Sequence, residues 1–245
     1  MLLAIDIGNT NITFALINKQ GKITRKYSIP TAQSRRLTYE IGLRSCRGRV
    51  IDKIFIVSVV PKALKEVKRG LKRKFKNTGI FVVGKDVKVP LKSLYNKREI
   101  GQDRLVTAFA ARSLYGLPVL IIDFGTAVTF DVVSKKGVYL GGLILPGIKM
   151  SLESLSEKTA MLPKIYLKKT HLFIGKDTTS SIRSGISYGY SAICEGLIDL
   201  FRKRIDKNIK VIATGGDAPL ISRYTPSMKR IDLDISLKGL YLLSL

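Results

Sequence analysis

The sequence predicts an α/β protein made of two similar domains, and three observations support this fold class. Residues 4–14 and 121–130 each run from an apolar strand through Asp-x-Gly, then Asn or Thr, into an alternating Thr-Phe strand. Hairpin-type turns follow both copies, at residues 19–22 and 134–137. The repeat period is near half the chain length, whereas solenoid repeats recur about every 20–50 residues. We therefore expect two domains that face a phosphate-binding cleft.

The first half predicts the element order βββαβαβ. Its strands show apolar runs or an alternation of apolar and polar residues, and its helices show apolar residues at helical spacing. The expected elements are strands 2–8, 12–18 and 22–29, a helix over 38–46, strand 53–60, a helix that Pro61 opens, and strand 80–83.

The helix that begins at Pro61 is strongly basic. Leu64, Val67, Leu71 and Phe75 fall at helical spacing and predict one buried stripe. A solvated helix face explains the surrounding cations better than a nucleic-acid surface, because no recognition motif or aromatic-rich basic stretch accompanies them. These cations are Lys62, Lys65, Lys68, Arg69, Lys72, Arg73, Lys74 and Lys76.

The second half predicts the same arrangement of strands as the first. An amphipathic helix over 103–114 connects the halves, and Gly116 and Pro118 mark its end. The expected domains are therefore 1–116 and 117–245. The elements expected in the second half are strands 119–123, 128–133 and 137–145, a helix over 149–157, a polar stretch, a helix over 181–204, and strand 210–214.

The composition indicates a soluble globular protein. Hydrophobic residues make up 45% of the 245 residues, which excludes general disorder. The longest apolar runs, residues 54–60 and 119–122, are strand-sized, so we expect no membrane span. Met1 leads into a predicted strand without a basic segment or cleavage site, and we expect a cytoplasmic location.

The counts of cysteine, histidine and charged residues narrow the chemistry. Cys46 and Cys194 lack paired spacing and His171 is the sole histidine, so we expect neither a disulfide framework nor a zinc site. The net charge is +25, from 43 Lys and Arg against 18 Asp and Glu. Such a charge steers polyanions toward the surface, whether nucleotide, nucleic acid or membrane.

The two Asp-Gly turns contain residue types that bind phosphates and cations. In residues 6–11, glycine lets the backbone approach an oxyanion, Asn and Thr supply neutral donors, and Asp can hold a divalent cation. The same residue types recur in residues 123–127. One such turn is more often an ordinary loop. Two, each between a buried strand and a hairpin strand, favour phosphate binding.

Two glycine pairs and an acid–cation pair follow these turns. The glycines in residues 141–147 and 214–217 form tight turns or, in residues 214–216, a flat backbone surface for an adenine. Asp103 and Arg104 lie side by side at a predicted helix start. Asp103 either takes part in chemistry or stabilises the helix dipole, an effect of about 0.3–1 kcal/mol.

Short stretches along the whole chain, each common by itself, occur in a specific order. They are residues 6–10, 57–61, 101–104, 123–127, 141–147, 159–163, 181–185 and 214–216. In this order they resemble type III pantothenate kinases, a branch of the acetate and sugar kinase/Hsp70/actin superfamily. The resemblance implies two ribonuclease H-like domains, duplicated βββαβαβ units, around a nucleotide cleft. It also implies ATP-dependent phosphorylation of pantothenate to 4'-phosphopantothenate, the first step of coenzyme A biosynthesis.

By this resemblance, one set of residues would bind ATP and its cations. Asp123 would hold the monovalent cation that the family uses, K⁺ or NH₄⁺, and Asp6 would hold Mg²⁺. Thr126, Gly215 and Gly216 would contact ATP. The residues around its phosphates would be Asp6, Ile7, Gly8, Asn9, Thr10, Asn11, Ile12 and Thr13.

A second set would bind pantothenate, with Asp103 as the catalytic base that accepts the hydroxyl proton. A weak base suffices, because phosphoryl transfer passes through a loose transition state and depends on alignment and charge stabilisation. Arg104 would pair with a carboxylate such as that of pantothenate, or anchor Asp103. The set is Tyr95, Gly101, Gln102, Asp103, Arg104 and Thr178.

The sequence departs from the family pattern at two places. Residues 96–100 lack the Asn-Pro that usually follows the tyrosine and are one residue shorter, which affects the role of Tyr95. Asp177 replaces the usual Asn before Thr178. Asp177 either brings a negative charge near an anionic substrate or caps the helix that starts near Ser181.

The resemblance also implies a homodimer whose pantothenate site is completed near the subunit interface. The helix over 184–200 is a candidate interface element, and core packing is the alternative for its apolar side. Two other functions remain open: a non-catalytic, nucleic-acid-associated transcriptional accessory factor of the same family, and a kinase for a sugar or small acid. The apolar residues concerned are Ile186, Tyr190, Ile193, Leu197 and Leu200.

Overall fold

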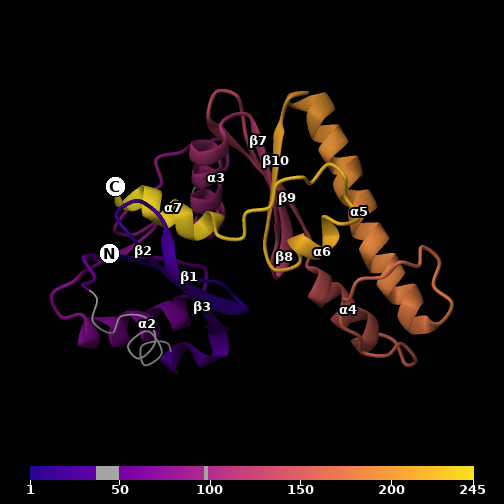
Figure 1. Cartoon of the computed structure of the whole chain (residues 1–245), viewed down its shortest axis with the longest axis horizontal. Helices are drawn as coiled ribbons and strands as arrows, with labels where there is room; N and C mark the ends of the chain where they lie inside the picture. The colour runs from indigo at the N-terminus through magenta and orange to yellow at the C-terminus, as the bar shows by residue number, and fades with distance from the viewer. Residues whose placement is uncertain (37–49, 97–98) are drawn as a thin grey trace. The chain divides into compact units, whose positions relative to one another are not determined.

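The computed structural model describes residues 1–36, 50–96 and 99–245, which form two compact units (Figure 1). Unit 1 comprises residues 1–91, 96–110 and 234–245 apart from the undescribed positions, and unit 2 comprises residues 92–95 and 111–233. Each unit contains a five-stranded sheet and helices, so the predicted α/β class with two similar domains is confirmed. The predicted helix over 38–46, and Cys46 with it, lies outside the described residues.

The sheet of unit 1 has the strand order β3-β2-β1-β4-β5. The first three strands run antiparallel in sequence, while β4 is parallel to β1 and β5 is parallel to β4. The central strand β1 is almost wholly buried, as expected for a strand covered on both faces. The strands are β1 (Leu2–Ile7), β2 (Asn11–Ile17), β3 (Ile23–Pro30), β4 (Lys53–Ser58) and β5 (Gly79–Val82).

Helices cover both faces of the unit 1 sheet. The basic helix α2 (Pro61–Lys74) buries Ala63, Val67 and Leu71 against one face and leaves most of its cations exposed, as predicted. The other face packs against α3 (Gln102–Tyr115) and α7 (Ile235–Ser244). Alternate residues of β1 contribute to the two cores, because successive side chains of a strand point to opposite faces. A short 3-10 helix, η1 (Thr31–Arg36), follows β3.

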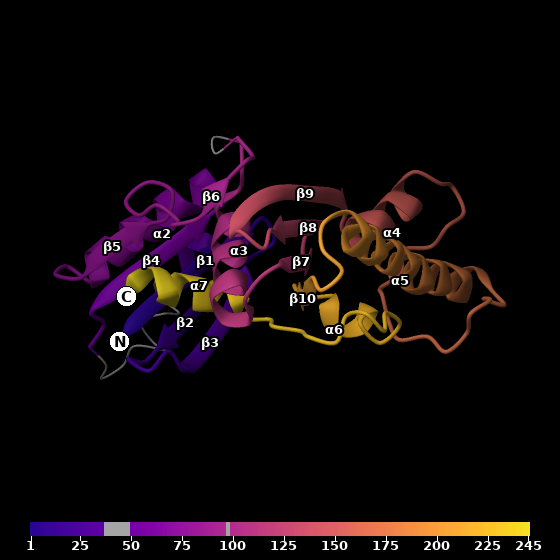
Figure 2. The same cartoon turned by 90° about the horizontal axis from the view of Figure 1, so that it is seen from above.

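The sheet of unit 2 has the strand order β10-β7-β8-β9-β6. Helices α4 (Ile148–Glu157), α5 (Thr178–Arg204) and α6 (Ala218–Ile221) contribute to one core against this sheet. Figure 2 shows α5 as the long helix of this unit. The strands are β6 (Lys92–Ser93), β7 (Val119–Phe124), β8 (Ala127–Val133), β9 (Val138–Pro146) and β10 (Lys210–Thr214).

The registers of the two sheets bear out the sequence repeat. Asp6 pairs with Thr13 across the first hairpin, and Asp123 pairs with Thr129 across the second. The copies differ at their edges, however. The chain leaves β10 into α6 rather than into a further strand, and the fifth strand of the unit 2 sheet is β6, beside β9. Unit 2 is therefore an incomplete copy of the βββαβαβ arrangement.

The compact units differ from a division into 1–116 and 117–245 at one place above all. Residues 234–245 belong to unit 1, although the sequence assigned them to the second half. The physical reason is the contact of α7 with α3. Gly239 has no side chain where Val106 and Ala110 approach it, so the two helices pack closely. The division at residue 116 itself stays a proposal.

Candidate active site

The first Asp-Gly turn joins β1 to β2 in unit 1. Gly8 N donates to Asn11 O at 3.0 Å, which closes the turn. Thr31 holds it from outside, because its Oγ1 donates to Gly8 O at 2.7 Å and its N–H donates to Thr10 O at 2.9 Å. Asn9, Thr10 and Asn11 are exposed at the tip. The turn therefore presents polar groups to solvent on a fixed backbone.

Two of the predicted ATP-binding residues in this segment have side chains in the core. Ile7 and Ile12 are fully buried in unit 1, so only their backbone groups could face a phosphate. Thr13 is partly buried, and its Oγ1 lies 3.1 Å from Ser28 Oγ in hydrogen-bond contact. The exposed polar residues at the tip are thus better placed for a ligand than the flanking isoleucines.

Asp6 lies at the end of β1, and its partner comes from the far end of the chain. Ser236 Oγ, in the first turn of α7, donates to Asp6 Oδ2 at 2.6 Å. The two residues are 230 positions apart in sequence. Nothing in the local sequence around either residue indicates this contact, which required the docking of α7 on unit 1.

The environment of Asp6 favours its neutral form. Burial raises the pKa of Asp6 to about 6, the hydrogen bond from Ser236 opposes this rise, and the negative charge of Asp103 adds to it. The carboxylates of Asp6 and Asp103 are therefore close enough for their charges to repel each other. A divalent cation between or beside them would offset their mutual repulsion. This pair of carboxylates therefore suits a Mg²⁺ site.

Asp103 lies in the first turn of α3, as the sequence predicted. Its Oδ1 accepts a hydrogen bond of 2.8 Å from Arg104 N, and it lies where a side chain on Gly101 would otherwise be. Val59, after the end of β4, lines the same place. Asp103 is only partly buried, so its carboxylate is positioned by the helix start and still reachable.

The second Asp-Gly turn joins β7 to β8 in unit 2. Gly125 and Thr126 are exposed at its tip, and Gly125 N donates to Ala127 O at 3.1 Å. Gly215, after β10, has φ +88° and lies against the Asp123 carboxylate, so a side chain there would meet both strain and a collision. Asp123, Thr126 and the Thr-Gly-Gly turn, including the exposed Gly216, are thus gathered at the carboxyl ends of β7 and β10.

The residues predicted to bind pantothenate are divided between the two units. Gly101 to Arg104 belong to unit 1, where the Gln102 side chain lies over Gly84. Tyr95 belongs to unit 2, where it lies beside Gly141 of β9 and is partly buried. Thr178 is the first residue of α5 and is exposed. Lys97 and Arg98, in the shortened loop after Tyr95, lie outside the described residues.

Asp177 caps α5, which was one of its two predicted roles. Its carboxylate accepts from Ser180 N at 2.9 Å, while Ser180 Oγ accepts from Asp177 N at 3.1 Å, so the two residues form a capping box. These hydrogen bonds hold the pKa of Asp177 below its ordinary value. Its contribution to stability is therefore present above its unfolded pKa and is lost as the pH falls.

We expect Asp177→Ala to lower the thermal midpoint by a few degrees at pH 7, and Asp177→Asn to leave it nearly unchanged. Asn still accepts from Ser180 N, whereas Ala leaves the first turn of α5 without its cap. Circular dichroism melts of the three proteins measure this. Equal midpoints for the Ala variant and the native chain would show that the cap does not matter. A lower KM for pantothenate in the Asn variant would instead favour the charge-repulsion role.

Two residues near the predicted site were not predicted from the sequence. Ser236 is one, since α7 itself was not predicted. An apolar pattern in residues 235–243 could have indicated the helix but not its contact with Asp6. Asp217 is the other: it follows the Thr-Gly-Gly turn, and burial raises its pKa. It adds a further acid near Gly216 in unit 2.

The described residues were searched for metal-binding clusters, free cysteines and membrane-spanning helices. Within residues 1–36, 50–96 and 99–245, no group of three or more His, Cys, Asp or Glu side chains gathers as a metal centre. Magnesium does not need one, because it usually keeps several waters and binds one or two carboxylates together with substrate phosphates.

Cys194 is a buried free thiol, and burial raises its pKa to about 12. No helix in the described part of the chain could span a membrane.

Known proteins resemble this chain over nearly its whole length. Residues 2–200 match the family model described as type III pantothenate kinase. A type III pantothenate kinase from Sulfurihydrogenibium sp. is 38% identical over 250 residues, covering 99% of each chain. The enzyme of that name from Listeria welshimeri is also 38% identical, over 252 residues that cover 99% of this chain and 96% of the relative.

Solved structures extend the likeness to the fold. An inorganic polyphosphate/ATP-glucomannokinase from Arthrobacter sp. aligns with a TM-score of 0.51 at 16% identity, covering 99% of this chain and 98% of the other. A Campylobacter jejuni protein that bears the name of a Baf family transcriptional activator aligns with a TM-score of 0.58 at 21% identity, covering 98% and 96%. Both likenesses are likenesses of fold.

Proposed function

We propose that this chain, which belongs to the type III pantothenate kinase family, phosphorylates pantothenate with ATP and uses Asp103 as the base. The product is 4'-phosphopantothenate, the first intermediate of coenzyme A biosynthesis. Identity of 38% over 99% of both chains is the observation that carries this function. The presence of Asp6 and Asp103 in one electrostatic neighbourhood of unit 1 supports the assignment of roles.

In the proposed mechanism, the protein aligns the reactants and stabilises charge. The transition state of phosphoryl transfer is loose in most analyses, so little covalent chemistry is required of the protein. Asp103 accepts the proton of the pantothenate hydroxyl as the bond from that oxygen to the γ-phosphorus of ATP forms, while the bond from this phosphorus to the bridging oxygen breaks and ADP leaves. Its place in the first turn of α3 and its hydrogen bond from Arg104 N orient it for this step.

The first Asp-Gly turn is the proposed binding place of the ATP phosphates. Asn9, Thr10 and Asn11 are exposed on a turn that Thr31 holds in place, and backbone N–H groups of such turns bind phosphate oxygens. Asp6 would hold Mg²⁺, which supplies charge neutralisation to the phosphates when bound. In unit 2, Thr126, Gly215 and Gly216 would contact ATP, and Asp123 would hold K⁺ or NH₄⁺. These four residues lie together at the carboxyl ends of β7 and β10, which supports this proposal.

Pantothenate is a carboxylate, and Arg104 is the one cation among the residues proposed to bind it. Arg104 would pair with that carboxylate or orient Asp103, and Tyr95 and Thr178 would add hydrogen bonds. Gln102 would act through its backbone, because its side chain lies over Gly84. We place the enzyme in the cytoplasm, where ATP is available as the donor.

A coupled assay of ADP release tests the function. With ATP, Mg²⁺ and K⁺ present, ADP should form when pantothenate is added, and much more slowly with glucose, mannose or acetate as acceptor. ATP consumption with one of these acceptors, and none with pantothenate, would overturn the acceptor assignment. The transcription-factor alternative has only a fold likeness behind it, and a likeness at 21% identity shows the fold alone.

We also propose that the enzyme is a homodimer that uses part of the α5 surface. The predicted apolar side of α5 divides in two: Tyr190 is buried, with its hydroxyl donating to Pro146 O at 2.8 Å, whereas Ile193 and Leu200 are 42% and 46% exposed. Ile186 and Leu197 pack against the unit 2 core. An exposed apolar surface of this kind is typical of an interface. Other exposed apolar residues of unit 2 include Met150, Met161, Tyr166, Phe173 and Ile174.

Light scattering tests the dimer and its surface. The native chain at micromolar concentration should have about twice its chain mass of 27.2 kDa, and Ile193→Lys should have the mass of one chain, because a cation would be buried without a partner. Leu114→Lys is a matched control, since Leu114 is 43% exposed on α3. A native chain that stays monomeric would refute the dimer, and a dimeric Ile193→Lys would place the interface elsewhere.

A further inference from the structure

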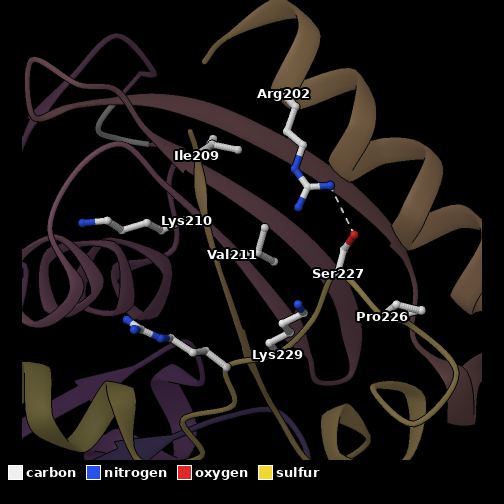
Figure 3. A pocket seen from close by; sticks show the side chains of 8 residues that line it. Arg202, Ile209, Lys210, Val211, Pro226, Ser227 and Lys229 are labelled. Carbon is white, nitrogen blue, oxygen red and sulfur yellow. Dashed lines mark hydrogen bonds between the residues drawn. The ribbon is translucent and has the colours of Figure 1, made fainter. Parts of the chain in front are cut away.

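Unit 2 contains an open cavity of 490 Å³ that the proposed kinase mechanism does not use. Figure 3 shows its walls, which come from the end of α5, the start of β10 and residues 226–230, which precede the bridge of Ile231 with Ala213 of β10. The volume falls in the range of about 300–1,000 Å³ typical of sites for small molecules. The residues that line it are Arg202, Ile209, Lys210, Val211, Pro226, Ser227, Lys229 and Arg230.

The lining of this cavity is cationic. Four of its residues are Lys or Arg and none is Asp or Glu. Arg202 is held in place, because its Nη1 donates to Asp199 Oδ1 and to Ser227 Oγ, both at 3.2 Å. A guanidinium carries five N–H donors, so further donors on Nε and Nη2 remain available to a ligand. In Figure 3, Arg202 and Lys229 lie on two sides of Val211.

The two other cations are fixed by Tyr115 and act at longer range. Lys210 Nζ donates to Tyr115 O at 2.7 Å, and the Arg230 guanidinium carbon lies 5.8 Å from the centre of the Tyr115 ring. Figure 3 shows the Lys210 side chain extending away from Arg202 and Lys229. Glu195 lies behind the lining, where it accepts from Ser227 N at 2.8 Å. The groups that face the cavity directly therefore remain positive.

The floor of the cavity is apolar and includes a sheet edge. β10 is the edge strand of the unit 2 sheet, and Ala213 uses its N–H and C=O on the outer side, toward Arg230 and Asp232. Backbone groups alternate in direction along a strand, so the N–H and C=O of Val211 point to the same outer side. Beside them are the side chains of Ile209, Val211 and Pro226.

This cavity lies at the opposite end of β10 from the predicted ATP residues of unit 2. Lys210 and Val211 begin the strand, whereas Thr214 ends it and leads into Gly215 and Gly216. Ligands of open α/β sheets usually bind at the carboxyl ends of the strands. A ligand at the amino end of β10 would therefore occupy a second site.

We propose that this cavity is a second ligand site, which binds a small organophosphate with an apolar body. Arg202 and Lys229 bind the phosphate from two sides, with Ser227 Oγ and the Val211 N–H as neutral groups beside them. Guanidinium and ammonium groups suit phosphate oxygens, and the apolar floor of Ile209, Val211 and Pro226 takes the body of the ligand. An inorganic anion would fill only part of the volume.

Isothermal titration calorimetry with phenyl phosphate tests the site. No nucleotide is added, because ADP is itself an organophosphate with an apolar base and would compete for the site. The variants described below assign the binding to this cavity. We expect one equivalent of phenyl phosphate to bind, at least about tenfold more tightly than inorganic phosphate, because a buried apolar ring is worth more than a tenfold gain in affinity. Benzyl alcohol, which lacks the phosphate, should not bind.

Charge-removing variants assign the binding to this cavity. Arg202→Gln and Lys229→Gln should each raise the Kd for phenyl phosphate about tenfold, since each removes a charge-assisted hydrogen bond. Lys203→Gln is the matched control, because Lys203 is exposed in the same last turn of α5 but does not line the cavity. Its Kd should change by less than about twofold, the effect of net charge alone.

Three results would overturn the proposal. They are the absence of binding by the native chain, an equal loss in all three variants, and binding of phenyl phosphate no tighter than that of inorganic phosphate. Lys229 is exposed, so its variant tests the site even if Arg202→Gln disturbs the end of α5. Neither variant touches residues proposed for catalysis, so the ADP-release assay with pantothenate should give native rates.

Discussion

Replacing Asp103 by Asn should lower kcat by about 10²–10⁴-fold, the usual contribution of a positioned acid or base, and leave the KM for ATP nearly unchanged. Asn keeps the shape of the side chain and can still accept from Arg104 N, so the fold and the start of α3 are retained. It cannot accept the proton of the pantothenate hydroxyl. Steady-state rates of ADP release at saturating pantothenate measure the effect.

A matched variant separates this effect from a general loss of charge. Asp52→Asn removes an exposed carboxylate of unit 1, which forms an ion pair of 2.6 Å with the Met1 amine. Its kcat should equal that of the native chain. If Asp103→Asn keeps native activity, Asp103 is not the base, whatever the reaction catalysed.

Asp6→Asn should abolish most of the kinase activity and, at neutral pH, stabilise the metal-free protein. Activity falls because a neutral amide is a poor ligand for Mg²⁺ and the ATP phosphates lose their counter-charge. Stability rises because the native protein must bury a carboxylate beside Asp103, whereas Asn carries no charge and can still accept from Ser236 Oγ. Active sites commonly trade stability for function in this way.

The sign of the pH dependence follows from the raised pKa of Asp6. Below the ordinary aspartate pKa of 3.8, the carboxyl is protonated in both the folded and the unfolded chain, so the charge costs nothing. Between 3.8 and about 6 the folded chain holds a proton that the unfolded chain has released, and the free energy of unfolding falls as the pH rises. Above about 6 the full cost is present, up to about 3 kcal/mol from a difference of roughly two pKa units.

Urea unfolding of metal-free native and Asp6→Asn proteins measures this cost. The variant should gain stability over the native protein at pH 7.5, and the gain should shrink as the pH approaches 4. Added Mg²⁺ and ATP should stabilise the native protein and have little effect on the variant. A variant that is less stable than the native protein at pH 7.5 would show that the Asp6 charge is favourable in the fold.

Local patterns in the sequence predicted most of the fold. The strands of both hairpins have apolar runs or alternation, and α2 has a strong apolar stripe opened by Pro61, so their positions follow from periodicity. The C-terminal helix α7 was not predicted, nor was its place in unit 1. That place depends on the contact of Gly239 with Val106, a packing event between residues far apart in sequence.

In the candidate site, too, local motifs indicated some residues, whereas other features depend on how distant elements pack together. Local motifs drew attention to Asp6, Asp103 and Asp123, and the family resemblance supplied the roles expected of Asp103 and Asp123. The Ser236 contact and the raised pKa of Asp6 could not be predicted, because both depend on which elements pack around β1. The sequence left two roles open for Asp177, and the structure shows that it caps α5. This capping box with Ser180 could not be predicted, because α5 begins at Thr178 and not near Ser181, where the sequence placed its start.

In the proposed mechanism, Asp103 accepts the hydroxyl proton of pantothenate while the Asp6 turn holds the phosphates of ATP. A crystal structure with pantothenate, Mg²⁺ and a non-hydrolysable ATP analogue tests it most directly. We expect the Asp103 carboxylate within hydrogen-bond reach of the pantothenate hydroxyl, about 2.6–3.2 Å, with the analogue's phosphates at Gly8 to Asn11. A hydroxyl held by another acid, or phosphates bound away from this turn, would contradict it.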